Sequence, residues 1–198
     1  RVPYEYVQKF FTDVKNPDYA AGSYDFKDAR AGYFYIKGRT ESMQDNLNTF
    51  LNGWSCIKFN NVPHDMDAVD YAATAATKNF SDIDWPLIRL GEINLIYAEA
   101  CMHAGGDAAA QVKALADRAG VAAPKTIDAE WLMAERAREL MWEAHRRTDL
   151  IRYGLYDTPA YLWPYKGGDT FAGQPFPAYK RLFPIPPTEL ATNKALVQ

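Results

Sequence analysis

The sequence has little of what several common kinds of protein require. It holds only 2 cysteines, Cys56 and Cys101, so it cannot form a disulfide scaffold, and we expect both thiols to be unpaired and buried. No run of about 18 apolar residues occurs, because Arg89, Glu92 and Glu99 interrupt the most apolar stretch, and no membrane span is therefore predicted. The sequence also begins without a methionine, signal peptide or lipidation motif, which favours a processed or truncated product.

Chemical motifs are equally scarce. The 22 Lys and Arg residues stand against 25 Asp and Glu, a net charge of −3, whereas nucleic-acid binding needs a dense basic face. The 3 histidines show no paired spacing for zinc, and neither a phosphate-binding glycine loop nor a G-x-S-x-G motif is present. The acidic turn from His64 to Asp70 offers oxygen ligands for calcium but lacks the Gly and distal Glu of an EF-hand. We predict no cofactor, with calcium at this turn as the alternative.

Aromatic residues, in contrast, are abundant. They make up 14% of the chain, with 5 Trp, 13 Tyr and 10 Phe. Of these, 13 lie in residues 1–60 and 9 in residues 153–183. Such side chains either fill a core or form exposed contact surfaces.

The chain divides into three parts by its pattern. Residues 1–80 are rich in aromatics, Gly, Asn and Pro, which predicts an irregular part with short helices such as 4–11 and 43–51. Residues 84–154 have strong helical periodicity and are the predicted helical core. Residues 155–198 form a predicted loop and tail.

Three helices are expected within that core. The first starts at Asp84 and ends at the Gly105-Gly106 pair, and its apolar residues surround it on nearly every side. The second runs over 107–119 and ends at a glycine, forming an αα-hairpin with the first. The third is predicted as one long helix from Ile127, capped by Thr126, to about Tyr153. Trp85, Tyr97, Trp131 and Trp142 are read as core residues.

The third helix carries a ladder of carboxylates. Glu135, Glu139 and Glu143 are four residues apart, so they share one face, and the like charges destabilise the helix unless cations intervene. Arg138 and Arg146 lie three residues after Glu135 and Glu143 and can supply those cations. Two carboxylates at this spacing could also act as the acid and nucleophile of a glycosidase. An ion-pair network that fixes the packing of the helix is the simpler interpretation.

Four motifs, in order, resemble the SusD/RagB family of glycan-binding outer-membrane lipoproteins. Residues 84–100, DWPLIRLGEINLIYAEA, resemble the family's P-x-I-R-x-x-E-I-x-L-x-Y-A-E-A helix, and 118–120 resemble its R-A-G. Residues 135–154 are similar to its E-R-x-x-E-L-x-x-E-G-H-R-x-x-D-L-I-R-W-G signature, with Ala144 in place of the Gly. The ending 182–198 is similar to its P-I-P-x-x-E-L-x-x-N-P-x-L-x-Q-N.

The resemblance implies a fold, a function and a location. It implies that residues 1–198 are the C-terminal RagB/SusD-like region of a longer protein, with an all-α, tetratricopeptide-like helical-repeat core and long irregular aromatic-rich loops. It implies a non-catalytic, starch-binding-like lipoprotein on the outer membrane. Such a protein binds oligosaccharide or polysaccharide and passes it to a TonB-dependent, SusC-like transporter. Attachment to the membrane would be only through an N-terminal lipid absent from this chain, and no nucleic acid is implied.

The ligand site in this family lies on variable loops, not in the signature motifs. Flat aromatic rings remove the apolar face of a sugar from water, while polar neighbours bind its hydroxyl groups. The candidate ligand-binding residues are therefore Tyr33, Tyr35, Trp54, Trp163 and Tyr165. Packing against the helices is the competing role for each of them. A carbohydrate-active hydrolase and a protein-protein interaction scaffold remain the alternative functions.

Overall fold

The computed structural model describes residues 1–41, 43, 49–59, 83–163 and 171–196. The chain forms two compact units, Arg1–Ala144 and His145–Gln198. The predicted calcium turn at 64–70, the predicted helix at 43–51 for the most part, and the candidate Tyr165 lie outside the described residues.

The first unit opens with a small α+β region. Helix α1 (Tyr4–Phe10) is followed by strands β1 (Lys15–Asp18) and β2 (Ser23–Asp25), which pair antiparallel. The 3-10 helix η1 (Ala29–Tyr33) leads into β3 (Phe34–Tyr35), which pairs antiparallel with β4 (Ser55–Cys56). The apolar sides of α1 and β3 pack around Trp54, which has no exposed surface. Cys56 is half-buried and, like the buried Cys101, is a free thiol.

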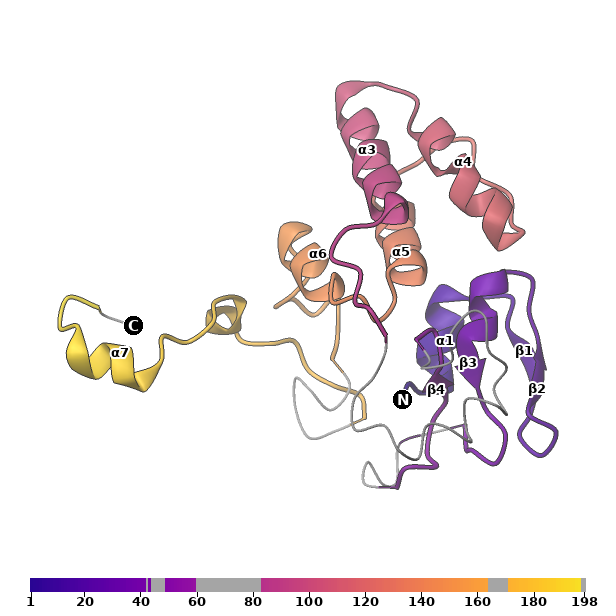
Figure 1. The fold of residues 1–198 in the computed structure, drawn as a ribbon, viewed down its shortest axis with the longest axis horizontal. Coiled ribbons are helices and arrows are strands. Elements are labelled where there is room, and N and C mark those ends of the chain that lie inside the picture. The colour runs from indigo at the N-terminus through magenta and orange to yellow at the C-terminus, as the bar shows by residue number, and fades with distance from the viewer. Residues whose placement is uncertain (42, 44–48, 60–82, 164–170, 197–198) are drawn as a thin grey trace. The chain divides into compact units, whose positions relative to one another are not determined.

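In the helical hairpin of the first unit, residues next to the second helix determine where that helix starts and ends. Helix α3 (Leu90–Ala104) ends at Gly105 and α4 (Ala108–Ala119) ends at Gly120, and both glycines have positive φ. The carboxylate of Asp107 accepts a hydrogen bond from the Ala110 amide and so caps α4. The two helices lie side by side (Figure 1), which confirms the predicted hairpin.

Helix α3 starts later than predicted. Residues 84–89 are not helical, and α3 begins only after Arg89, whose backbone is extended. Arg89 gives α3 no side-chain cap, because its guanidinium group binds Glu139 and Glu143. A tertiary contact therefore sets this boundary, where the sequence suggested an Asp84 cap with Pro86 in the first turn.

The single helix predicted from Ile127 to Tyr153 is wrong. Helix α5 (Ala129–Glu139) starts at Asp128, whose side chain accepts from the Trp131 amide, so Asp128 takes the capping role predicted for Thr126. Helix α6 (Arg146–Arg152) is a separate helix of the second unit. Between α5 and α6, Trp142 and Ala144 both have a φ of 64°, in the left-handed region, which ends a right-handed helix.

The second unit contains α6, the 3-10 helix η2 (Ala178–Arg181) and helix α7 (Pro187–Thr192). Leu150 of α6 is fully buried, and Tyr156 and Tyr161 are buried as well. The rings of Tyr156, Tyr161, Trp163 and Phe176 form one cluster, with centroids 4.7–5.5 Å apart in the contacting pairs. This part of the predicted loop and tail is therefore held together by aromatic contacts.

The described chain is mainly helical, with four short strands in its first 56 residues. This confirms the predominance of helix in the expected fold and adds two small sheets to it. No helix among the described residues has the length and apolarity needed to cross a membrane.

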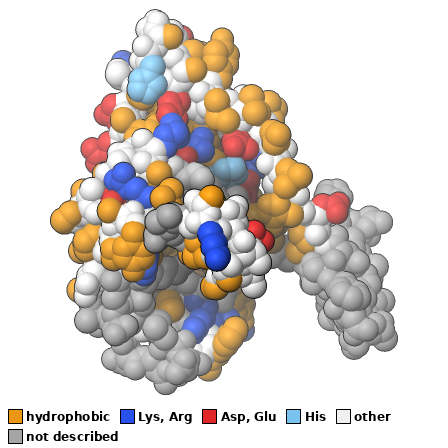
Figure 2. All heavy atoms as spheres, turned by 90° about the vertical axis from the view of Figure 1, so that its left-hand side faces the viewer, with side chains coloured by type: hydrophobic (Ala, Val, Ile, Leu, Met, Phe, Trp, Pro, Cys, Tyr) orange, Lys and Arg blue, Asp and Glu red, His pale blue; other side chains and the backbone are white. Residues whose placement is uncertain are grey.

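Several apolar residues predicted to be buried are exposed. Trp85, Tyr97 and Trp142 are 52%, 57% and 50% exposed, and only Trp131 packs partly against a core. Helix α3 was expected to be packed on nearly every side, yet Leu90, Ile93 and Ile96 are exposed, because it buries one face against α4 and α5. The space-filling view accordingly shows many hydrophobic side chains at the surface (Figure 2).

Candidate functional site

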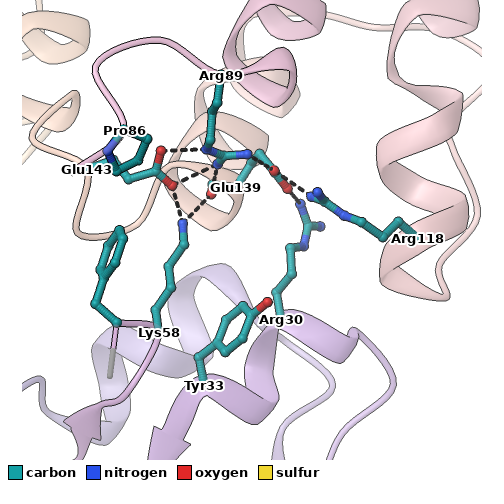
Figure 3. A pocket seen from close by; sticks show the side chains of 9 residues that line it. Arg30, Tyr33, Lys58, Pro86, Arg89, Arg118, Glu139 and Glu143 are labelled. Atoms are coloured by element: carbon teal, nitrogen blue, oxygen red, sulfur yellow. Dashed lines mark hydrogen bonds and ion pairs between the residues drawn. The ribbon is translucent and has the colours of Figure 1, made fainter. Parts of the chain in front are cut away.

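A charged cavity lies in the first unit. Its volume is about 260 Å³, and Figure 3 shows the side chains that line it. Four cationic side chains, two carboxylates, two aromatic rings and a proline form its wall: Arg30, Lys58, Arg89, Arg118, Glu139, Glu143, Tyr33, Phe59 and Pro86. They come from η1, the segment after β4, the turn before α3, α4 and the end of α5.

Glu139 is the centre of an ion-pair network. Its side chain is 1% exposed and accepts hydrogen bonds from three guanidinium groups, those of Arg30, Arg89 and Arg118. The Arg89 Nη1 atom lies 2.6 Å from Glu139 Oε1, and the Arg30 Nη1 atom lies 3.1 Å from Oε2. A carboxylate removed from water in this way is stable only because it is fully paired.

Arg30 joins η1 to helix α5. It is 5% exposed, and all its guanidinium nitrogens donate, to Asp28, Glu135 and Glu139. Arg138 adds a further ion pair with Glu135 at 2.8 Å, as the spacing predicted. The carboxylate ladder is therefore a buried ion-pair network, in agreement with the simpler of its two interpretations.

Lys58 and Arg89 bind the end of α5. The Lys58 ammonium group donates to the carbonyl oxygens of Glu139 and Met141, and Arg89 Nη2 also donates to the Glu139 carbonyl at 2.6 Å. In a continuous helix the Glu139 carbonyl would accept from the Glu143 amide, but that amide bonds to Leu140. Cations from distant segments thus satisfy the carbonyls at this helix end and complement its dipole.

The two carboxylates of the cavity cannot supply a proton at neutral pH. Burial raises the pKa of Glu139, but hydrogen bonds from Arg118 and Arg89 outweigh this effect and lower the pKa to about 2. The pKa of Glu143 is lowered as well, since hydrogen bonds from Arg89 and Lys58 outweigh its burial. A glycosidase needs a carboxylic acid whose pKa is raised. This pair therefore lacks the general acid that a hydrolase would require.

Two predicted ligand residues are exposed where η1 meets β3. Tyr33, the last residue of η1, and Tyr35 of β3 are 41% and 45% exposed, and the buried Phe34 lies between them in sequence. The amide of Ile57 donates to the Tyr33 carbonyl at 2.7 Å, which continues the pairing of β3 with β4. The Arg39 guanidinium group lies 5.7 Å from the centroid of the Tyr35 ring. We call Tyr33, Tyr35, Arg39 and Ile57 the tyrosine face.

The tyrosine face adjoins the charged cavity, because Tyr33 belongs to both (Figure 3). On another part of the cavity wall, Phe59 stacks on Trp85 with centroids 5.4 Å apart and an interplanar angle of 21°. Trp85 is half exposed, so this pair also presents aromatic surface to solvent. The sequence predicted Trp85 as a core residue, and this prediction is wrong. Its exposure depends on which distant segments surround it, and the local sequence does not specify them.

Trp54 has the packing role and no accessible ring surface. It is 0% exposed, its ring stacks on Tyr4 at 5.0 Å, and it also contacts Tyr19, Tyr24 and Phe34. Trp54 lies just before β4, where its backbone pairs with that of Val2, and the core residues of α1 and β3 surround its ring. The candidate role of Trp54 as a ligand platform is therefore corrected to that of a core residue.

Trp163 lies in the second unit, in the aromatic cluster described above. It is partly buried, and its indole N–H donates to the Tyr156 carbonyl at 3.0 Å. The same unit has a second cavity of about 350 Å³, which is lined by Arg147, Lys180 and aromatic and apolar residues but not by Trp163. Trp163 thus has both packing contacts and some exposed area.

Sequence reasoning missed the partners of the carboxylates. Arg30 and Lys58 lie in the aromatic-rich part, with no pattern around them that signals burial, and nothing near Arg89 or Arg118 in sequence indicates a carboxylate partner on α5. Their pairing with α5 joins segments 50 or more residues apart for Lys58, Arg30 and Arg89. The described residues contain no cluster of three or more side chains suited to a metal ion.

Comparison with known proteins agrees with the order of motifs. Residues 7–198 match the family described as the SusD family. The chain is 35% identical over 162 residues to the Starch-binding protein SusD of Bacteroides thetaiotaomicron, an alignment that covers 81% of this chain. It spans only 28% of that relative's length. On the family match and this identity together, the chain belongs to the SusD family.

Proposed function

We propose that this protein is a non-catalytic glycan-binding protein of the cell surface. It binds oligosaccharide or polysaccharide for import through a TonB-dependent, SusC-like transporter in the outer membrane. The observation that carries the proposal is the similarity to a starch-binding protein, in a chain that presents two exposed tyrosines, Tyr33 and Tyr35, where η1 meets β3.

The tyrosine face has the chemistry that sugar binding needs. Tyr33 at the end of η1 and Tyr35 on β3 are two residues apart in sequence and both exposed, so the two rings can contact neighbouring parts of one glycan. Their rings offer apolar surface to the C–H groups of a sugar, and the Tyr33 and Tyr35 hydroxyls with the Arg39 guanidinium group offer hydrogen bonds to its hydroxyls. Trp163, with its remaining exposed area, is a weaker second contact.

The arrangement in the membrane and the whole fold are part of the same proposal. We infer that residues 1–198 are the C-terminal region of a longer lipoprotein, held in the outer membrane by an N-terminal lipid. The α3–α4 hairpin fits a tetratricopeptide-like repeat, since two antiparallel helices are its unit. In this arrangement, 84–154 are the helical core, and the irregular parts 1–80 and 155–198 carry ligand contacts.

Hydrolysis is a poorer explanation of the charged cavity. Both of its carboxylates are held ionised by arginine and lysine partners, and each oxygen of Glu139 is already hydrogen-bonded. A protein-protein interaction scaffold would also use exposed aromatics, and the test below separates it from glycan binding.

Native gel electrophoresis in the presence of dissolved polysaccharides tests the proposal. The full-length protein should migrate more slowly in a gel containing a glycan that it binds, and starch is the first to try. Tyr35→Ala should abolish most of this retardation with an unchanged melting temperature. The matched control is Tyr97→Ala on α3, a tyrosine that is also exposed, at 57%, and lies far from β3 in sequence.

Release of reducing sugar from the same polysaccharides would show an enzyme and overturn the non-catalytic part of the proposal. Unretarded migration with every polysaccharide tested would overturn glycan binding itself. Equal loss of retardation in Tyr35→Ala and Tyr97→Ala would remove the tyrosine face as the site.

A further inference from the structure

We propose that the charged cavity of the first unit binds an anionic sugar residue, a uronate or a sulfated pyranose, through Arg118. The inference rests on the proposed glycan binding and specifies the class of sugar. It starts from the size of the cavity, about 260 Å³. Pockets for drug-sized ligands have volumes of about 300 to 1,000 Å³, so this cavity suits a single sugar ring at a time.

The accessible charge in the cavity is positive. The carboxylates of Glu139 and Glu143 are 1% and 2% exposed, whereas the side chains of Arg89 and Arg118 are 24% and 56% exposed. A ligand that enters therefore meets guanidinium groups before it meets carboxylate oxygens. Charged donors in a partly enclosed site interact with an anion more strongly than donors in open water do.

Arg118 is the cation with donors left for a ligand. A guanidinium group has five N–H donors, and among the described residues Arg118 uses one of its nitrogens, Nη2, on Glu139 Oε1. Lys58 has three acceptors for its three donors, and every nitrogen of Arg30 is committed to a carboxylate. Arg118 is therefore exposed to solvent and has guanidinium N–H groups available to donate to a ligand.

The excess of arginines around Glu139 also favours an anionic ligand at Arg118. This one carboxylate accepts from Arg30, Arg89 and Arg118, and Arg89 Nη1 and Arg118 Nη2 share the same oxygen. A ligand carboxylate or sulfate would give Arg118 an anionic partner of its own. Arginine binds both groups through two parallel N–H bonds, which is stronger and more directional than a single contact.

Aromatic rings complete the site. Tyr33 lines the cavity and is 41% exposed, and no hydrogen bond of its hydroxyl occurs among the described residues. Phe59, stacked on Trp85, lines the cavity too. A pyranose can place an apolar face on such a ring while its anionic group reaches Arg118. The buried residues Arg30, Glu139 and Glu143 form the supporting network and need no ligand.

Calorimetric titration of the full-length protein with oligogalacturonide tests the inference, because methyl esterification removes its charge and keeps its backbone. We expect the free acid to bind at least about tenfold more tightly than the ester, with affinity that falls as salt concentration rises. Sulfated and unsulfated dextran oligosaccharides form the second matched pair. Inorganic sulfate alone should bind much more weakly than either anionic sugar.

Substitutions locate the charge. Arg118→Gln should remove the preference for the acid, and Arg118→Lys should restore only part of it, because lysine is a point charge without the planar fork. Lys113→Gln is the control, since Lys113 lies on the same helix, is 67% exposed and pairs with Asp117. It should leave the preference unchanged.

Equal affinity for acid and ester in both pairs would overturn the inference, as would an unchanged preference in a folded Arg118→Gln protein. If Arg118→Gln does not fold, the wild-type comparison of acid with ester still decides. Binding of neutral glycans without a preference for acids would leave the proposed function standing. Binding of no glycan at all would overturn the function and the inference together.

Discussion

Arg89 and Glu143, 54 residues apart, form a bidentate ion pair. Arg89 Nε donates to Glu143 Oε2 at 2.6 Å, and Arg89 Nη2 donates to Glu143 Oε1 at 2.8 Å. The same arginine also binds the side chain and the carbonyl of Glu139. The turn before α3 is thereby fixed to the end of α5.

Removing the central carboxylate should be strongly destabilising. Glu139→Gln leaves three guanidinium groups with one charged acceptor fewer in a buried network, and we expect a loss of about 3 to 5 kcal/mol in the free energy of unfolding. Urea denaturation measures it. Glu130→Gln, at an exposed position of the same helix, should change stability by about 0.5 kcal/mol or less. Similar losses in the two variants would contradict a special role of Glu139.

Stability should fall in acid through the same residue. The pKa of Glu139 is about 2 in the folded protein against an ordinary value of 4.5, so its contribution is complete above pH 4.5. It is lost progressively as the pH falls from 4.5 towards 2, and amounts to about 2 to 3 kcal/mol. Thermal melts across this range check it. The curve of Glu139→Gln should be flatter, and parallel curves would refute the assignment.

Ala144→Gly should stabilise the protein. Ala144 has a φ of 64°, a conformation that costs an L-residue about 1 kcal/mol and glycine almost nothing, and the family pattern has Gly at this position. Chemical denaturation should show a gain of about 1 kcal/mol. The same change at the exposed, helical Ala110 of α4 should instead cost about 0.5 to 1 kcal/mol. A loss of stability in Ala144→Gly would mean that its methyl group is needed for packing.

Trp54→Ala should act on stability and not specifically on ligand binding. The ring is fully buried and contacts four other aromatic rings, so its removal should cost about 3 to 5 kcal/mol in the free energy of unfolding. Denaturation followed by tryptophan fluorescence and circular dichroism measures this cost. A folded Trp54→Ala protein with full stability and lost glycan binding would restore Trp54 as a ligand residue.

Arg147→Gln should loosen the segment around η2 in the second unit. The Arg147 guanidinium group lies 5.1 Å and 4.5 Å from the ring centroids of Tyr156 and Phe183, and it donates to the carbonyls of Lys180 and Arg181 at 2.9 Å each. Trypsin should therefore cut after Lys180 and Arg181 severalfold faster in the variant. Lys194→Gln, in the exposed tail, is the control. Unchanged cleavage rates would show that these contacts do not hold the segment.

Local signals determined the parts of this fold that depend on neighbours in sequence. Asp107 and Gly120 set the two ends of α4 as predicted, because a capping side chain and a left-handed glycine act within one turn. The family motifs, being an ordered pattern of residues, identify the family from the sequence alone.

The tertiary structure alone decided the features that depend on distant charges. A continuous helix through Trp142 was the natural expectation, and the helix ends at Glu139, where Lys58 and Arg89 bind the Glu139 and Met141 carbonyls. The same long-range pairing buries Glu139 and leaves the Arg118 side chain 56% exposed. Packing between distant segments likewise decides that Trp54 is buried and Trp85 exposed. Helical periodicity registers contacts three or four residues apart, and so it carries no record of partners 50 residues away.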